Sequence, residues 1–207
     1  MDKGKLLIIS GFSGVGKGTV VNKILEDFDN YKISISATTR DPRPAEKDGV
    51  HYHFVDKSDF EKMIDNDELL EYAQYVDNYY GTPARFVKDN LDKGNNVILE
   101  IESEGARKVK AKMPEAIMIF VLPPSAKHLK ERLVGRNTED STAIEKRLKK
   151  AVEETGAMKD YEFFVINDDI AGCASNIDKI VTDTDPDLPN EDEVLNIKQD
   201  IIDFSRE

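Results

Sequence analysis

Short runs of consecutive apolar residues alternate with amphipathic stretches over most of the chain. The apolar runs show no regular polar alternation, which is typical of strands that are buried on both faces. They lie at residues 5–10, 96–101, 117–122 and 163–166. The amphipathic stretches repeat apolar positions every three or four residues and therefore predict helices. We expect these helices at residues 17–27, 57–66, 83–92, 103–113, 125–136, 142–154 and 171–181.

Between the apolar runs at residues 5–10 and 96–101, the hydrophobic pattern that indicates strands is weaker. Residues 31–36 and 51–55 indicate short strands, and residues 69–76 indicate a strand or an extended piece. Residues 37–44 are rich in proline, so we expect neither a helix nor an inner strand there. Residues 78–82 predict a turn. Strands that alternate with helices in this order predict an α/β fold with a parallel sheet and helices on both faces.

Glycines are concentrated between the first predicted strand and the first predicted helix. A strand, a glycine-rich loop and a helix in this order are the usual context of a phosphate-binding loop. Glycines let backbone N–H groups point at phosphate oxygens, and the helix N-terminus adds a favourable partial charge. Lys17 supplies a point charge for the outer phosphates. The candidate loop residues are Gly11, Phe12, Ser13, Gly14, Val15, Gly16, Lys17, Gly18 and Thr19.

One position of this loop departs from the usual pattern and concerns the metal. The common pattern ends in lysine followed by serine or threonine, whereas Gly18 follows Lys17 here and the hydroxyl group lies on Thr19. The direct ligand of a Mg²⁺ ion is therefore left open. The alternative explanation for the whole segment is a glycine-rich turn that only connects a strand to a helix.

Composition limits the classes of function. The 207 residues carry a net charge of −12, which argues against a nucleic-acid partner. Six acidic residues and no lysine or arginine lie at 182–193, so much of the negative charge belongs to one late segment. Because the overall charge does not attract phosphate groups, local arginines and Mg²⁺ have to hold them. No apolar run approaches the roughly 20 residues of a membrane span, and we see no signal peptide before the first strand. Cys173 is the only cysteine, which fits a reducing cytoplasm.

Two groups of arginines are candidates for holding phosphate. Arg40 and Arg43 flank a proline that stiffens their loop, and planar guanidinium groups match phosphate oxygens. Arg132 and Arg136 are one helical turn apart and share a face, while Arg147 follows on the next predicted helix. Such a helix–loop–helix unit can close over a phosphoryl group and exclude water. The alternative for both groups is a solvated, charged surface.

Carboxylates indicate where a base and a metal bind. Glu100 and Glu102 lie at the end of a predicted strand, at the carboxyl edge of the sheet where ligands bind in such folds. One could hold Mg²⁺ through water and the other could contact a base, unless both only pair with lysines. Glu71 is able to accept the N1 and N2 protons of guanine, while the hydroxyl of Thr82 or Ser36 donates to O6. Adenine has no N1 proton and would leave the carboxylate unpaired.

Over residues 6–180 the chain resembles the guanylate kinases. The resemblance rests on motifs that follow the family order: GFSGVGKGT, SISATTRDPRP, DGVHYHFV, NYYGT, ILEIE, FVLPPS, RLVGRN, EKRL and VINDD. Members of this family transfer the γ-phosphoryl group of ATP to GMP in the presence of Mg²⁺, and give GDP and ADP. The resemblance therefore implies an ATP- and Mg²⁺-dependent kinase of guanine nucleotide metabolism that acts on GMP, with dGMP as a further acceptor.

The resemblance also implies roles for individual residues. The ATP-binding residues would be the loop at 11–19, Arg132, Asn167 and Asp168, the last two beside the adenine. The GMP phosphate would be held by Arg40, Arg43, Tyr52 and Tyr80, and the guanine would be read by Ser36, Glu71, Thr82 and Glu102. The groups that act on the transferred phosphoryl would be Lys17, Arg43, Arg132, Arg136 and Arg147. Mg²⁺ would be held by Thr19 and, through water, by Glu100.

The implied organisation is a P-loop kinase fold over residues 1–181. It has a core, a GMP-binding region at about 33–94 and a mobile lid at about 135–149. Residues 182–207 would form an acidic linker and an additional helix, which either docks on the body or binds a partner. Several positions depart from the commonest family pattern, namely Phe12, Gly18, Glu100, Glu102, Glu104 and Asn137.

Two rival functions stay open at this point. One is a non-catalytic binding module, because guanylate-kinase-like domains of scaffold proteins resemble this fold but lack a working phosphate loop. The other is a related kinase with a different phosphorylated acceptor. The intact loop and the arginines disfavour the first, and the choice of acceptor depends on Glu71.

Overall fold

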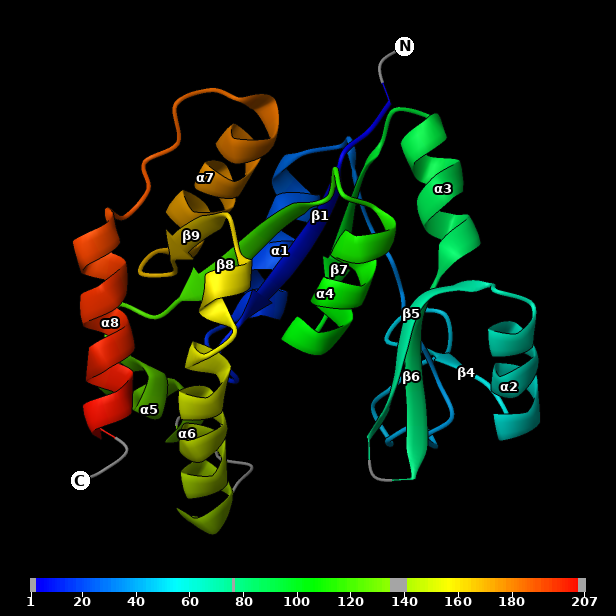
Figure 1. The fold of residues 1–207 in the computed structure, drawn as a ribbon, viewed down its shortest axis with the longest axis horizontal. Coiled ribbons are helices and arrows are strands. Elements are labelled where there is room, and N and C mark those ends of the chain that lie inside the picture. The colour runs from blue at the N-terminus through cyan, green and yellow to red at the C-terminus, as the bar shows by residue number, and fades with distance from the viewer. Residues whose placement is uncertain (1–2, 76, 135–140, 205–207) are drawn as a thin grey trace. The chain divides into compact units, whose positions relative to one another are not determined.

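The computed structural model describes residues 3–75, 77–134 and 141–204 (Figure 1). Its chain divides into two compact units, which share strand β1 (Leu6–Gly11). The first unit, Met1–Ile8 with Asn30–Ala116, contains β2 (Tyr31–Ile33), β3 (Ala37–Thr38), β4 (His53–Phe54), α2 (Lys57–Asp65), β5 (Leu69–Tyr75), β6 (Asn78–Pro83), α3 (Ala84–Asp92), β7 (Asn96–Glu100) and α4 (Ser103–Lys112).

The second unit, Ile9–Asp29 with Ile117–Glu207, contains most of the helices. Its strands are β8 (Ile117–Leu122) and β9 (Phe163–Ile166). Its helices are α1 (Lys17–Asp27), α5 (Ala126–Val134), α6 (Ser141–Thr155), the 3-10 helix η1 (Met158–Asp160), α7 (Ile170–Thr182) and α8 (Glu191–Phe204). Of the predicted lid at 135–149, residues 135–140 lie outside the described residues, and Arg136 is among them.

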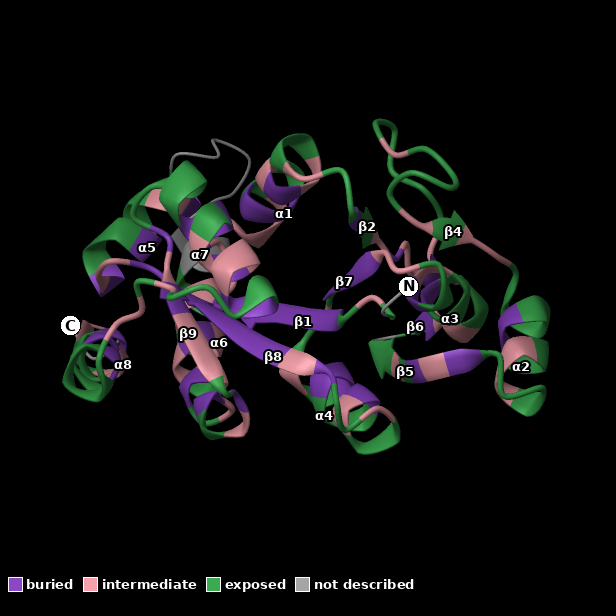
Figure 2. Ribbon diagram, turned by 90° about the horizontal axis from the view of Figure 1, so that it is seen from above, coloured by how far each residue is buried: buried purple, intermediate pink, exposed green. Residues whose placement is uncertain are grey.

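The main sheet has the strand order β2-β7-β1-β8-β9. The pairs β2–β7 and β8–β9 are parallel, as predicted from the alternation of strands and helices. Each residue of β1 is buried, as expected of an uninterrupted apolar run. In the second unit α1 packs against α7, and Figure 2 shows these two helices on one side of β8 and β9 and α6 on the other. None of the helices within the described ranges is long and apolar enough to cross a membrane.

The second sheet, with the order β4-β3-β6-β5, shows where the sequence prediction was wrong. Residues 78–82, predicted as a turn, belong to β6, which pairs antiparallel with both β5 and β3. Ala37–Thr38, which we did not expect in an inner strand, forms β3 between β4 and β6. The prolines behind that expectation lie further along the loop, where they remove no ladder hydrogen bond. Gly81 suits β6 because a Cβ there would lie 3.0 Å from both the Glu71 carbonyl oxygen and Phe60 Cζ.

Helix α8 follows the acidic segment and packs against α5 and α6 within the second unit. Its residues Val194, Ile197 and Ile201 are buried. The carboxylate of Asp200 accepts a hydrogen bond of 2.6 Å from the backbone N–H of Ala126, in the first turn of α5. A carboxylate at a helix N-terminus satisfies a free donor and complements the helix dipole, so α8 stabilises the start of α5.

The burial of Ile201 gives a first prediction. Ile201 is 3% exposed, so Ile201→Ala is expected to lower the free energy of unfolding by about 2–4 kcal/mol. Leu195 lies on the same helix but is 51% exposed, so Leu195→Ala is the matched control and should change stability by no more than about 0.5 kcal/mol. Urea unfolding of the two variants measures both values. Equal effects of the two changes would mean that α8 does not pack as described.

Candidate active site

The glycine-rich loop joins β1 to α1 in the second unit. Gly14 and Gly16 have φ angles of 89° and 98°, which residues with a side chain rarely adopt. A Cβ at Gly14 would lie 2.4 Å from Leu133 Cδ2, and a Cβ at Gly16 would lie 2.8 Å from Asn167 Nδ2. Gly16 is also the N-cap residue of α1, so the loop leads directly into a helix N-terminus. The strand–loop–helix arrangement predicted from the sequence is therefore present.

Lys17 folds back over the beginning of this loop. Its Nζ donates hydrogen bonds to the carbonyl oxygens of Gly11 and Phe12, at 2.7 and 3.2 Å. The ring of Phe12 is fully buried and meets the ring of Phe120 edge to face, with centroids 5.1 Å apart. Phe12, which departs from the commonest family pattern, therefore packs in the core of the second unit. It does not prevent Lys17 from contacting the loop.

Two residues predicted to bind ATP, Arg132 and Asn167, donate side-chain hydrogen bonds to the backbone of the loop. Arg132, on α5, donates from Nη1 to the Val15 carbonyl oxygen at 2.9 Å and from Nη2 to the Asn167 carbonyl oxygen at 2.7 Å. Asn167 Nδ2 donates to the same Val15 oxygen at 2.8 Å. In this structure the guanidinium group of Arg132 supports the backbone of the loop, and its role as a phosphate ligand stays a prediction.

A third support of the loop, Glu154, is not predicted by any motif of the sequence. Glu154, in the last turn of α6, accepts the backbone N–H of Ser13 with its Oε2 atom at 3.0 Å. Ser13 and Glu154 are 141 positions apart, and Glu154 is one of several charged residues on a helix for which a solvated surface was the alternative interpretation. No local pattern distinguishes this residue from its neighbours.

The predicted base-reading residues Glu71 and Thr82 meet in the first unit. Thr82 Oγ1 donates to Glu71 Oε1 at 2.7 Å, and both side chains are buried. Burial raises the pKa of the Glu71 carboxyl, while the hydrogen bond from Thr82 and the charge of Lys108 partly oppose this rise. A buried carboxylate with one oxygen bonded to a hydroxyl still has acceptor capacity on the other oxygen.

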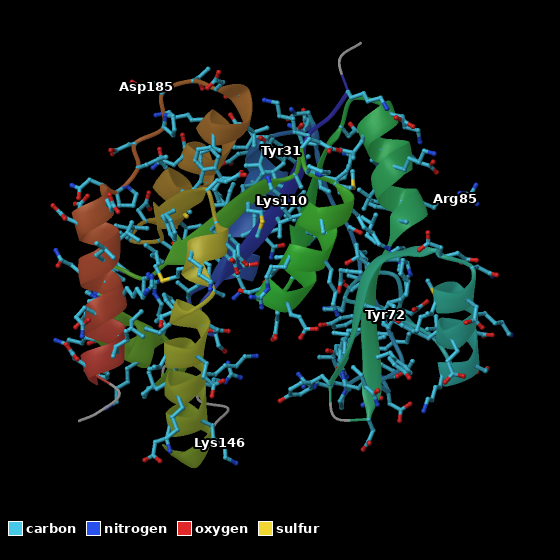
Figure 3. All side chains as sticks on the ribbon, viewed as in Figure 1. Tyr31, Tyr72, Arg85, Lys110, Lys146 and Asp185 are labelled. Atoms are coloured by element: carbon cyan, nitrogen blue, oxygen red, sulfur yellow. The ribbon has the colours of Figure 1, made fainter. Side chains whose placement is uncertain are left out.

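Helix α4 lies directly against this carboxylate. Lys108, on α4, donates to the carbonyl oxygen of Tyr72 at 2.9 Å and lies 6.0 Å from the centroid of its ring; Tyr72 is labelled in Figure 3. A Cβ at Gly105, in the first turns of the same helix, would be only 2.9 Å from Glu71 Oε2. The missing side chain at position 105 therefore leaves the space that Glu71 occupies.

We expect Gly105→Ala to displace the Glu71 carboxylate and, if Glu71 reads the base as the sequence predicts, to raise KM for GMP about tenfold. Alanine is favoured over glycine inside helices by about 1 kcal/mol, so a general loss of helix stability is not the expected cause. Gly156→Ala is the control, because a Cβ there meets a backbone carbonyl oxygen at 3.3 Å outside this region. Steady-state kinetics of both variants, with thermal unfolding beside them, test the expectation, and an unchanged KM in Gly105→Ala would contradict it.

The predicted phosphate-holding residues of the first unit form a cluster around Arg40. The Arg40 guanidinium carbon lies 5.6 Å from the centroid of the Tyr52 ring, and the Tyr52 and Tyr80 rings are 6.0 Å apart. Arg40 Nη2 donates to both carboxylate oxygens of Glu46 at 2.9 Å. The backbone N–H of Arg43 also donates to Glu46, and these hydrogen bonds lower the pKa of the Glu46 carboxyl. Arg40, Tyr52 and Tyr80 therefore come together as predicted, whereas the side chain of Arg43 is exposed.

The other predicted residues lie at the ends of helices and strands. In the first unit Ser36 is half-buried, and its backbone carbonyl oxygen accepts the backbone N–H of His53. Glu100 ends β7, and Glu102 is the N-cap residue of α4. In the second unit the exposed ones are Thr19 in the first turn of α1 and Asp168 just after β9, and Arg147 is half-buried on α6.

The comparison with known protein families decides what this loop and these clusters belong to. A family model described as guanylate kinase matches residues 3–184. The chain belongs to the guanylate kinase family. The match covers the loop, the residues around Arg40 and Glu71, and helices α1 to α7. Helix α8 lies beyond it.

Individual guanylate kinases support the assignment. The chain is 50% identical over 180 residues to the guanylate kinase of Clostridioides difficile (strain 630), which covers 87% of this chain and 88% of that protein. It is 49% identical over 181 residues to that of Latilactobacillus sakei subsp. sakei (strain 23K), covering 87% and 89%. The crystal structure of guanylate kinase from Anaplasma phagocytophilum matches with a TM-score of 0.71 and 34% identity, over 88% of this chain and 86% of that one. This confirms the predicted α/β fold class.

Proposed function

We propose that this guanylate kinase family member transfers the γ-phosphoryl group of ATP to GMP and gives ADP and GDP. The observation that carries the proposal is the sequence identity of 49–50% between this chain and two guanylate kinases over most of each chain. The phosphate loop supports it, because its glycine backbone and Lys17 are both in place. A binding module without a working loop is not favoured.

The ATP side of the reaction is assigned to the second unit. Backbone N–H groups of the loop and the N-terminus of α1 attract the phosphate oxygens, and Lys17 exchanges its carbonyl partners for them. The Oδ1 atom of Asn167 is buried, and no hydrogen-bond donor contacts it within the described part of the chain. This acceptor suits the amino group of adenine, with Asp168 exposed beside it.

The GMP side is assigned to the first unit. Glu71 accepts the guanine N1 and N2 protons, and Thr82, whose hydroxyl proton is donated to Glu71, orients this carboxylate. The hydroxyl group of Ser36 then donates to O6, and Glu102 completes the hydrogen bonds to the base. The guanidinium groups of Arg40 and Arg43 and the hydroxyl groups of Tyr52 and Tyr80 hold the monophosphate. Because Glu46 neutralises Arg40 in this structure, the phosphate has to share this arginine with that carboxylate or displace it.

Catalysis rests on position and positive charge. Phosphoryl transfer asks little covalent chemistry of a protein, so in-line placement and neutralisation of the moving oxygens provide most of the acceleration. Lys17, Arg43 and Arg147 are described residues that supply positive charge, and Arg136, which lies outside the described residues, belongs to the same proposal. Closure of the region at 135–149 would exclude water, which would otherwise take the phosphoryl group.

The side chains of the chain fit a magnesium ion that travels with the nucleotide. Within the described residues no group of three or more acidic, histidine or cysteine side chains converges on one point. Mg²⁺ is commonly held by one or two protein ligands, water and substrate phosphates. In the second unit the hydroxyl of Thr19 is exposed and can serve as such a ligand, and the water-mediated role of Glu100 in the first unit stays a prediction. When bound, the ion would neutralise charge on the β- and γ-phosphate oxygens.

We place the enzyme in the cytoplasm. Its single cysteine, Cys173, is buried, and burial raises the pKa of the thiol to about 12. Such a thiol is protonated and unreactive at neutral pH. A chain with one cysteine has no internal disulfide to form, which fits a reducing compartment.

A coupled assay of ADP formation with ATP, Mg²⁺ and GMP tests the proposal. We expect turnover with GMP, weaker turnover with dGMP and background rates with AMP or ribose phosphates. No ADP above background with any acceptor would favour the binding module. AMP as the best acceptor would overturn the assignment of Glu71, although it would leave the phosphate loop assigned.

A further inference from the structure

The carboxylate of Glu154 contacts the phosphate loop from a helix far along the chain. Its Oε2 atom accepts the Ser13 N–H at 3.0 Å, and the side chain is half-buried. The hydrogen bond is charge-assisted, because a carboxylate accepts it, and such bonds are about twice as strong as neutral ones. An acidic side chain is otherwise unexpected next to a site that binds a triphosphate, so this contact needs a function.

The contact completes the support of the loop around Gly14. Gly14 has a φ of 89° and no side chain that restricts it. The residue after it, Val15, is fixed by the two hydrogen bonds that its carbonyl oxygen accepts from Arg132 and Asn167. The residue before it, Ser13, is fixed by Glu154. The Phe12–Ser13 and Val15–Gly16 peptide groups, which enclose the segment centred on Gly14, are therefore held by side chains from α5, from the end of β9 and from α6.

Glu154 also connects the loop to the helix that carries Arg147. The two residues are seven positions apart on α6, so they project from nearly the same side of this helix. A hydrogen bond at the last turn of α6 fixes the end of the helix relative to the loop. Arg147, two turns away, thereby starts from a defined position.

We infer that Glu154 is a positioning residue that holds the phosphate loop in its ATP-binding conformation and fixes α6 relative to it. The inference rests on the proposed function, since it gives the loop the task of binding ATP. The carboxylate acts through Ser13 and through α6, and it does not itself contact the substrate. The competing possibility is that Glu154 occupies an anion position and has to leave when the triphosphate binds.

Three substitutions at this position and one neighbouring control test the inference. Glu154→Ala removes the acceptor, Glu154→Asp keeps the charge but withdraws it by about 1.5 Å, and Glu154→Gln keeps an acceptor oxygen without the charge. Glu153→Ala is the control, because Glu153 is exposed on the same helix. ATP affinity is measured by calorimetry without GMP, and KM for each nucleotide and kcat are measured in the coupled assay.

We expect Glu154→Ala and Glu154→Asp to weaken ATP binding about tenfold and to lower kcat, with KM for GMP unchanged. Glu154→Gln should lie within about threefold of the wild type, and Glu153→Ala should equal it. Tighter ATP binding in Glu154→Ala or Glu154→Gln would overturn the inference in favour of a competing anion. Wild-type ATP affinity in Glu154→Asp, or equal changes for both nucleotides, would also overturn it.

The binding measurement separates this inference from the proposed function. If the wild-type chain bound ATP but did not phosphorylate GMP, the proposed function would fail while the titrations of the Glu154 variants would still be informative. If Glu154→Ala did not fold, which circular dichroism would show, the nearly isosteric Glu154→Gln and the shortened Glu154→Asp decide the outcome.

Discussion

Lys17→Ala is expected to lower kcat for ATP and GMP by about 10²- to 10³-fold, with little change in KM for GMP. The ammonium group now contacts the carbonyl oxygens of Gly11 and Phe12, at the start of the loop that we assign to the triphosphate. Charge on the transferring oxygens is greatest at the transition state, so the loss of this cation affects the rate more than the binding of the acceptor.

A second lysine of the same helix provides the control. Lys23 lies on α1 and forms a 2.7 Å ion pair with Asp27, which is worth little at an exposed site. Lys23→Ala removes the same charge from the same helix and should keep kcat within about twofold. Initial rates in the coupled assay measure both variants. A wild-type kcat in Lys17→Ala, or an equal loss in Lys23→Ala, would refute the assigned role.

Glu71→Gln is expected to raise KM for GMP about 10- to 100-fold and to reduce the preference for GMP over AMP. An amide has one acceptor oxygen and would present N–H groups to the N–H groups of guanine, whereas the carboxylate accepts from both. Rates with GMP and AMP as acceptors give the preference directly. Glu61→Gln is the control, since Glu61 is exposed on α2 in the same unit. An unchanged GMP-to-AMP ratio would show that Glu71 does not read the base.

The same substitution should change how stability depends on pH. Burial raises the pKa of Glu71 above its ordinary value of 4.5, so the folded chain binds this proton more tightly than the unfolded chain does. The carboxyl group therefore lowers the free energy of unfolding as the pH rises from about 4.5 through the raised folded pKa. We expect Glu71→Gln to gain stability relative to the wild type between about pH 4 and pH 7, as urea unfolding at both pH values would measure.

The sequence predicts the buried strands of the main sheet well, but of the second sheet it predicts β4 and β5 and misses β3 and β6. Strands β7 and β8 follow from uninterrupted apolar runs, which need no knowledge of their partners. Strand β6 does not, because Asn78 and Gly81 are typical of turns when only neighbouring residues are considered. Its strand conformation comes from pairing with β5 on one side and β3 on the other, which is a tertiary effect.

In the candidate site, too, the sequence predicts residues that belong to local motifs and misses contacts between distant residues. The glycine loop and the types of the residues around Arg40 and Glu71 are visible in the sequence because they occur in local motifs. The supports of the loop are not, since Arg132 and Glu154 contact it from positions 117 and 141 residues away from Val15 and Ser13, respectively. A charged residue on an amphipathic helix looks the same in the sequence whether it faces water or a backbone amide.

The hydrogen bonds of Lys17 to its own loop affect the thermodynamics of nucleotide binding. A freely rotating lysine side chain carries roughly 2 kcal/mol of rotamer entropy, most of which is lost when the ammonium group is fixed. In this chain the carbonyl oxygens of Gly11 and Phe12 already restrict that rotation. When a triphosphate binds, Lys17 would therefore exchange neutral carbonyl acceptors for anionic phosphate oxygens with little further loss of side-chain entropy. We expect a favourable enthalpy to dominate the contribution of Lys17 to the binding free energy.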